Sequence, residues 1–319
     1  MDFEKRFNDL LSVISPNISG ILGRLSSEIK KNIYEIRIRI GCPVALSTNK
    51  GIMYLSKISQ IESRPSSDCY IASKSDISES FRMVCGYSVY SFQNEIKNGY
   101  ITVKGGHRIG IAGTAVIEND SVLTVKDISS LNYRVARQVQ GIAKPIADRL
   151  FGMNKPICGA IIAGCPSSGK TTILRDLASL LSGGYLDRFV KVVVIDERGE
   201  LGAVYLGKPE NDMGICCDIL NGYPKDEGIM IALRCLAPDL IICDEIGTSK
   251  EVEAVQAGAN SGVPIITTVH ADSKASLFSR PQIKALLATG AFTDIVILEG
   301  KSSPGIVREF IKVSDFYDN

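Results

Sequence analysis

The segment whose residue types most directly suggest chemistry is the loop at 164–172, with the sequence GCPSSGKTT. It fits the pattern G-x-x-x-x-G-K-[ST] in full, through Gly164, Gly169, Lys170 and Thr171. An apolar stretch, GAIIAG, precedes the loop, and a helical pattern, KTTILRDLASLLSG, follows it. A phosphate-binding loop requires this context, so a glycine turn before an ordinary helix is the weaker interpretation. We therefore predict that the loop binds ATP together with Mg²⁺.

The loop combines backbone and side-chain groups that suit a triphosphate. Glycines let the backbone wrap the phosphates, so that consecutive N–H groups and the helix N-terminus face the anion. We expect Lys170 to reach the β- and γ-phosphates, and the hydroxyl of Thr171 to ligate Mg²⁺. The predicted nucleotide-binding set is the whole loop: Gly164, Cys165, Pro166, Ser167, Ser168, Gly169, Lys170, Thr171 and Thr172.

A second chemical signal is LIICDE, an apolar strand pattern that ends in Asp244 and Glu245. Solvated strand ends often carry acids, so this pair is weak by itself. Together with Lys170 and in the correct chain order, it is typical of the acidic strand of P-loop enzymes. We expect Asp244 to hold Mg²⁺, usually through water, and Glu245 to polarise the attacking water as the catalytic base.

Two further strand patterns end in polar residues. VKVVVIDERGEL places Asp196, Glu197 and Glu200 at a strand end, where ligand sites of parallel sheets gather. We predict that Glu197 and Glu200 orient water or metal, with a charged strand exit as the alternative. PIITTVHADS ends a strand at Thr268 and His270, and we expect a hydrogen bond from Thr or His there to sense the γ-phosphate; a core histidine bonded to the backbone is the alternative.

The elements that must position these residues change in character near residue 140. The first part mixes helical patterns with strands, including the strict alternation IYEIRIRI, and a hairpin turn is expected at Asn119 and Asp120. Helices are expected at 3–14, 18–31 and 75–97. This mixture of helical and strand patterns predicts an α+β N-terminal domain over residues 1–140.

The second part alternates apolar strands with helices. The strand patterns are PICGAIIAG, VKVVVID, PDLIICD, VPIITTVH and DIVILEG, and helices are expected to begin near Thr171, Asp226, Ser249 and Pro281. Continuous apolar strands separated by helices indicate a mostly parallel sheet that is covered on both faces. We therefore predict an α/β P-loop domain over residues 141–319.

Composition narrows the classes of function. The chain has 36 Lys and Arg against 35 Asp and Glu, for a formal net charge of +1, so no overall basic excess points to nucleic acid. Neither a signal peptide nor an apolar stretch of membrane-spanning length is expected. The nine cysteines form no C-x-x-C pair, which favours reduced cytosolic thiols over disulfides or zinc.

The order of these motifs resembles the ATPases of bacterial type II and type IV secretion systems. IALRCLAPDLIICDEIG followed by EAVQAGANSGVPIITTVHAD is similar to that family's run into its acidic strand, its alanine-rich helix and its histidine motif. The resemblance implies a RecA-like fold. The chain departs from the family at Asp244, where glycine is usual, so the assignment of metal to Asp244 depends on the broader P-loop class.

A resemblance that covers nearly the whole chain is to the stage III sporulation AA family of endospore-forming bacteria. EIRIRIGCPVAL, GYITVKGGHRIGIAGTA, VKDISSLNYRVAR, VVVIDERGEL and PKDEGIMIALRCLAPDLIICDEIG carry it, in order. It implies a mother-cell cytoplasmic ATPase, homo-hexameric and docked on membrane channel proteins of the stage III complex. It also implies that the N-terminal domain supplies an arginine to the nucleotide. Arg108 is the first candidate, and the others are Arg37, Arg39, Arg134 and Arg137.

Three functions therefore stand side by side. The first is an oligomeric ATPase motor of the secretion type, which accounts for every motif above. The second is a nucleic-acid motor on a RecA-like core, which would need a basic, aromatic face; the chain has no tryptophan. The third is a scaffold that binds nucleotide without hydrolysing it, and the acids at 244 and 245 argue against it.

Overall fold

The computed structural model describes residues 3–152 and 155–316. The contacts of the chain divide it into two compact units. The first unit contains the chain up to Arg137 together with Tyr205–Glu210, and the second contains Gln138–Val204 and the chain from Asn211 onward. The sequence does not reveal that Tyr205–Glu210 belongs to the first unit, because this short segment lies inside an α/β pattern that otherwise forms the second unit.

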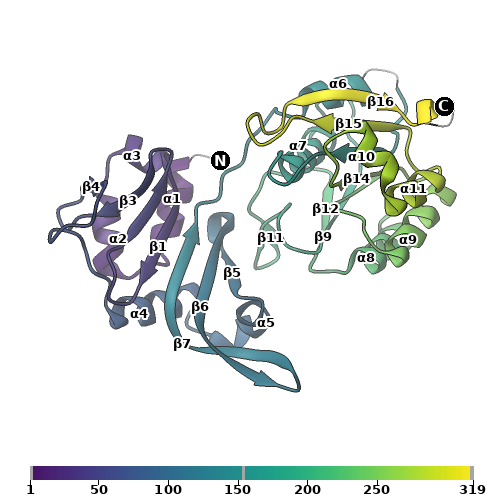
Figure 1. Ribbon diagram of the computed structural model, residues 1–319. Coiled ribbons are helices and arrows are strands. Elements are labelled where there is room, and N and C mark those ends of the chain that lie inside the picture. The colour runs from purple at the N-terminus through teal and green to yellow at the C-terminus, as the bar shows by residue number, and fades with distance from the viewer. Residues whose placement is uncertain (1–2, 153–154, 317–319) are drawn as a thin grey trace. The chain divides into compact units, whose positions relative to one another are not determined.

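The first unit is built on one antiparallel sheet with the strand order β4-β3-β2-β1-β7-β6-β5 (Figure 1). In strand β1, apolar and charged residues alternate, which places Ile36 and Ile38 in the core and leaves Arg37 and Arg39 exposed. The strands are β1 (Ile33–Arg39), β2 (Ala45–Thr48), β3 (Gly51–Leu55), β4 (Ile61–Glu62), β5 (Tyr100–Val103), β6 (His107–Glu118) and β7 (Ser121–Arg134). The expected turn at Asn119 and Asp120 joins β6 to β7, with φ of 49° and 57°.

Two of the helices expected here are each divided. The first of these ends and restarts because Ser26 caps a new helix, its side chain accepting from the amide of Ile29. The second is interrupted after Cys85, where Gly86 and Tyr87 take positive φ. The helices are α1 (Phe3–Leu11), α2 (Pro16–Gly23), α3 (Ser27–Lys31), α4 (Lys74–Val84), η1 (Val89–Phe92), α5 (Gln93–Lys97) and η2 (Lys104–Gly106).

The second unit is built on a sheet with the order β12-β9-β13-β14-β8-β15-β16. Neighbouring strands pair in parallel, except that β15 and β16 are antiparallel. The strands are β8 (Ala160–Ala163), β9 (Val192–Asp196), β12 (Cys217–Asn221), β13 (Leu240–Cys243), β14 (Ile265–Val269), β15 (Asp294–Leu298) and β16 (Val307–Lys312). Strands β10 (Val204–Tyr205) and β11 (Lys208–Pro209) form a separate two-stranded sheet, where the chain leaves the second unit for the first and then returns.

Helices cover both faces of this sheet. Those packed in one apolar core are α6 (Lys144–Phe151) and α7 (Lys170–Ser182). Those packed in the other are α8 (Lys225–Ile231), the π-helical η3 (Ala232–Leu236), α9 (Ser249–Asn260), α10 (Lys274–Ser279) and α11 (Pro281–Ala288); η4 (Ser314–Phe316) follows β16. Strands β8, β13 and β14 are adjacent and parallel, so their carboxyl ends meet at one edge of the sheet. No helix in the described ranges combines the length and apolar composition that crossing a bilayer needs.

Candidate functional site

The loop between β8 and α7 has a conformation that requires glycine. Gly169 has φ of 94°, and a Cβ added there would lie 2.7 Å from the backbone nitrogen of Gly305. A Cβ added at Gly164 would collide with the side chain of Ser168. The Gly305 amide donates to the carbonyl of Ser168 over 2.7 Å, so the segment after β15 supports the loop from outside.

Lys170 opens α7 and its ammonium lies inside this loop. Its Nζ donates to the carbonyls of Gly164 at 2.9 Å and Cys165 at 3.0 Å, and the residue is only 8% exposed. Burial lowers the pKa of Lys170 below its ordinary value, against the opposing charges of Asp244 and Glu245. The cation that a triphosphate would meet is therefore already held at the centre of the loop.

The residues predicted to hold a metal lie next to one another. The Oγ1 of Thr171 donates to Oδ2 of Asp244 over 3.0 Å. Thr268, at the end of β14, donates to the other carboxylate oxygen of Asp244 and accepts from the amide of Glu245 at 3.1 Å. A hydroxyl and a carboxylate are oxygen ligands of the kind that Mg²⁺ prefers, so the donor set fits this ion.

His270 connects the loop to the predicted base. Its Nδ1 lies 3.1 Å from Nζ of Lys170, and its Nε2 lies 3.3 Å from Oε1 of Glu245. Because an ammonium can only donate, Nδ1 is the acceptor and the ring proton sits on Nε2, facing Glu245. The structure therefore joins this histidine to two site residues, and the expectation that it senses the γ-phosphate stays a prediction.

Asp196, at the end of β9, accepts hydrogen bonds from the backbone of the turn that follows it. It is 2% exposed and accepts three amide hydrogen bonds, from Glu200 at 2.8 Å, Leu201 at 3.0 Å and Gly202 at 2.8 Å. Burial raises its pKa, and the three amides oppose that rise. Asp196 therefore shapes the turn that presents Glu197 and Glu200.

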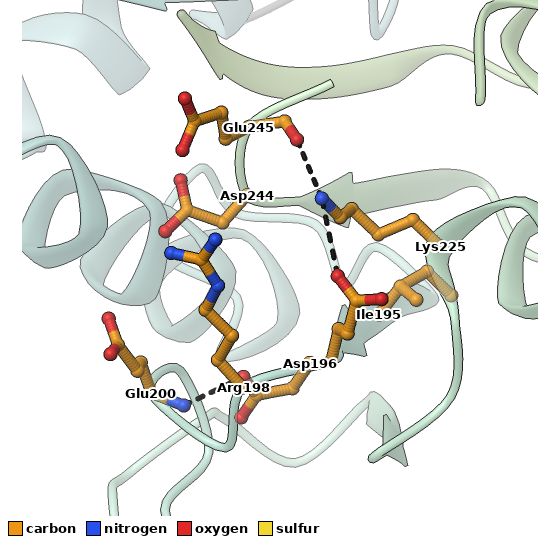
Figure 2. A pocket seen from close by; sticks show the side chains of 8 residues that line it. Ile195, Asp196, Arg198, Glu200, Lys225, Asp244 and Glu245 are labelled. Carbon is orange, nitrogen blue, oxygen red and sulfur yellow. Dashed lines mark hydrogen bonds and ion pairs between the residues drawn. The ribbon is translucent and has the colours of Figure 1, made fainter. Parts of the chain in front are cut away.

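Glu197 and Glu200 do lie beside the acids that end β13. They line one pocket, whose wall consists of Ile195, Asp196, Glu197, Arg198, Glu200, Lys225, Asp244 and Glu245. Figure 2 shows the Arg198 side chain pointing toward the carboxylate of Asp244. The strands β9 and β13 are neighbours, which places the two acidic segments side by side.

Lys225 is a member of this wall that the motifs did not reveal. It opens α8, where a lysine opposes the helix dipole, and such a placement is a weak sign of a specific partner. Its Nζ donates to the carbonyl of Glu245 at 2.8 Å and pairs with Glu251 at 3.0 Å and Glu197 at 3.3 Å.

The arginine candidates belong to the first unit. The guanidinium of Arg108, on β6, lies 4.2 Å from the centre of the Tyr100 ring. Arg37 pairs with Glu35 at 3.0 Å. Arg137 donates to the carbonyls of Lys31 and Ile33 and lies over the ring of Tyr34, which gives it a structural role.

The glycines before Arg108 form a turn packed against a buried histidine. Gly105 has φ of 84°, and a Cβ there would lie 2.7 Å from Nε2 of His107. His107 is fully buried, donates from Nε2 to the carbonyl of Arg6 over 2.7 Å, and accepts at Nδ1 from the amide of Ala136. This second histidine is therefore a core residue.

Comparison with solved structures supports the fold. The chain is similar to the ATPase DotB of Legionella pneumophila, with a TM-score of 0.51 and 15% identity, over 83% of this chain and 72% of that one. It is also similar to the pilus retraction motor PilT with bound ADP, with a TM-score of 0.54 and 14% identity, over 84% of this chain and 75% of that one. The chain thus has the RecA-like P-loop fold that these two proteins share.

Comparison by sequence gives the family. Stage III sporulation protein AA of Bacillus subtilis is 34% identical over 303 residues, which cover 95% of this chain and 94% of that protein. The protein SEEDLING PLASTID DEVELOPMENT 1 of Arabidopsis thaliana is 28% identical over 162 residues, covering 50% of this chain and 22% of that protein. The family described as sporulation stage III, protein AA matches residues 4–314. The chain therefore belongs to the sporulation stage III, protein AA family.

Proposed function

We propose that this chain is an Mg²⁺-dependent ATPase that serves as the motor of a secretion-type complex in sporulation. The observation that carries the proposal is the meeting of five groups at three adjacent strand ends. Lys170 and Thr171 follow β8, Asp244 and Glu245 follow β13, and His270 follows β14. Direct contacts, with Thr268 linking Asp244 to Glu245, join all five into one network.

These residues divide the work of phosphoryl transfer to water. The loop amides bind the phosphates of ATP, and Lys170 exchanges its carbonyl partners for the β- and γ-phosphate oxygens. Thr171 and Asp244 would hold Mg²⁺, which neutralises charge on the phosphates. Water attacks the γ-phosphorus while the bond to the β,γ-bridging oxygen breaks, and Glu245 takes the proton of that water. ADP and inorganic phosphate are the products.

The acidic turn and His270 assist this reaction. Glu197 and Glu200 line the pocket beside Asp244 and orient the water or the hydrated metal. His270 donates to Glu245 and contacts Lys170, so it reports the occupancy of the phosphate site to the base. An arginine of the first unit, with Arg108 as the candidate, completes the charge stabilisation at the γ-phosphate.

Membership of the family supports the proposed setting. The chain would act as a homo-hexamer on the mother-cell side, peripherally bound to membrane channel proteins of the stage III complex. DotB is described as an ATPase and PilT as a retraction motor, which supports a mechanical use of hydrolysis. Closure of the first unit on bound ATP and its release after hydrolysis would move the partner.

An activity assay tests this proposal. Phosphate release from ATP is measured with Mg²⁺, with excess chelator, and with single-stranded DNA at low salt. We expect release only with Mg²⁺, no stimulation by DNA, and no release by Lys170→Ala. Equal rates for wild type and Lys170→Ala would leave a nucleotide-binding scaffold, and strong stimulation by DNA would favour a nucleic-acid motor.

A further inference from the structure

We propose that Lys225 is a positioning residue that fixes the backbone of Glu245, and so aims the catalytic base. The inference rests on the proposed ATPase function and adds a residue to it. Lys225 lies in the first turn of α8, outside the motifs that form the phosphate site. It does not touch the reacting atoms, and its effect is exerted through Glu245.

The backbone of Glu245 needs such support. Its φ is 33°, in the left-handed region that residues other than glycine rarely adopt. The strand β13 has already ended at Cys243, so among the described residues no strand pairs with this peptide. A side chain attached to an unsupported peptide in this region would lose the direction that general-base catalysis requires.

Two side chains clamp the residue from opposite ends. The amide of Glu245 donates to Oγ1 of Thr268 at 3.1 Å, and its carbonyl accepts from Nζ of Lys225 at 2.8 Å. Figure 2 shows the Lys225 ammonium directed at that carbonyl, while the Glu245 carboxylate points away. The clamp therefore sets the backbone and leaves the carboxylate available for water.

The ammonium is itself held in place by carboxylates. Its Nζ lies 3.0 Å from Oε1 of Glu251 and 3.3 Å from Oε2 of Glu197, and the Lys225 side chain is only 12% exposed. Glu251 is anchored in turn, because its Oε2 accepts from the amides of Gly247 and Thr248 at the start of α9. Burial lowers the pKa of Lys225, but these two carboxylates outweigh burial and raise it, so the group stays charged.

The same contacts tie the acidic turn to the base. Glu197 follows β9, Glu245 follows β13, and Lys225 bonds both at one nitrogen atom. A change in the position of Glu197 would therefore move Lys225 and, through it, the peptide of Glu245. This gives Glu197 a role in alignment through Lys225, in addition to its place in the pocket wall.

The experiment is a double-mutant cycle between Lys225→Met and Glu245→Gln, with kcat and KM for MgATP measured separately. We expect K225M to lower kcat about 10- to 100-fold, because a displacement of about 1 Å can cost about 100-fold. KM should stay within about threefold, since the phosphate loop is intact. In the E245Q background, K225M should change the residual rate less than about twofold, because the group it positions is already disabled.

Two further variants separate positioning from folding. Lys191→Met is the matched control, since Lys191 also bonds a carbonyl, of Ala237 at 2.8 Å, and a carboxylate, of Asp239 at 3.5 Å, but is 61% exposed; its kcat should equal that of wild type. Lys225→Arg keeps the charge beside buried Glu251 and should fold like wild type. Its different geometry should still lower kcat, by about 3- to 10-fold.

The outcomes separate this inference from the proposed function. An active wild type with kcat within twofold for both K225M and K225R would overturn the positioning role alone. So would an equal loss from K225M in the wild-type and E245Q backgrounds. If K225M melts more than about 10 °C below wild type, the kcat of K225R decides. An inactive wild type would overturn the ATPase proposal, and the role of Lys225 with it.

Discussion

Glu245 and His270 are paired, with Oε1 of the carboxylate 3.3 Å from Nε2 of the ring. The other ring nitrogen of His270 faces the ammonium of Lys170 at 3.1 Å. One imidazole thus spans the distance between the group that would hold phosphate and the group that would activate water. In the proposed reaction, Lys170 would exchange its hydrogen bond to Nδ1 for one to phosphate, and the ring would pass this change to Glu245.

The first prediction concerns this imidazole. His270→Ala should lower kcat for ATP hydrolysis by about 10- to 100-fold, because the base loses the donor that orients it. KM should change little, since the loop and Lys170 remain. Steady-state kinetics at several ATP concentrations separates the two constants. A variant with kcat within twofold of wild type would show that His270 has no part in the reaction.

The second prediction concerns the phosphate loop. Gly169→Ala should lower nucleotide affinity at least about tenfold and the free energy of unfolding by about 1–3 kcal/mol, since the residue has positive φ. The added methyl would also press on the backbone of Gly305. Gly300→Ala is the control, because a Cβ there meets nothing within 4 Å. Titration with a fluorescent ATP analogue and urea unfolding measure both effects; equal behaviour of the two variants would count against a rigid loop.

The third prediction concerns the buried histidine of the first unit. Burial lowers the pKa of His107 from 6.5 to about 4. The folded state therefore resists a proton that the unfolded chain binds, so its stability is complete above about pH 6.5 and is lost as the pH falls toward 4. The loss should reach about 2–3 kcal/mol near pH 4.5.

A glutamine at this position provides the check, because its amide can also donate to one carbonyl and accept from one amide. Urea unfolding of wild type and His107→Gln, followed by circular dichroism at pH 7.5 and 4.5, compares the two acid dependences. We expect the variant to lose less stability on acidification. Identical slopes for the two proteins would mean that His107 does not govern the acid response.

Much of the second unit could be predicted because its central strands are mostly apolar and buried on both faces. VVVID of β9 and IITTV of β14 are buried along their whole length. Edge strand β16, VREFIK, does not stand out in the sequence because an edge strand can carry charges, and Ile311 is its one buried residue. The sequence does not show that Tyr205–Glu210 belongs to the first unit. That placement depends on hydrogen bonds to Glu210 from Arg6 and Gly105, which are distant in the sequence.

In the candidate site too, some features could be predicted from the sequence and others could not. Parallel strands ending at one edge bring Lys170, Asp244 and His270 together, and motif order alone was enough to expect this. The partners of a single carboxylate or ammonium depend on backbone details that no motif encodes. Asp196 therefore accepts from three amides of its own turn, and Lys225 reaches Glu245 from helix α8; no motif indicates either contact.

The most direct measurement compares wild type with Glu245→Gln in two assays on the same samples, binding of MgATP and release of inorganic phosphate. The account predicts that both proteins bind MgATP with similar affinity. It also predicts that the variant releases phosphate about 100- to 10,000-fold more slowly, since it lacks only the general base. Equal rates of phosphate release would contradict the assignment of Glu245, and the absence of release from wild type would contradict the ATPase itself.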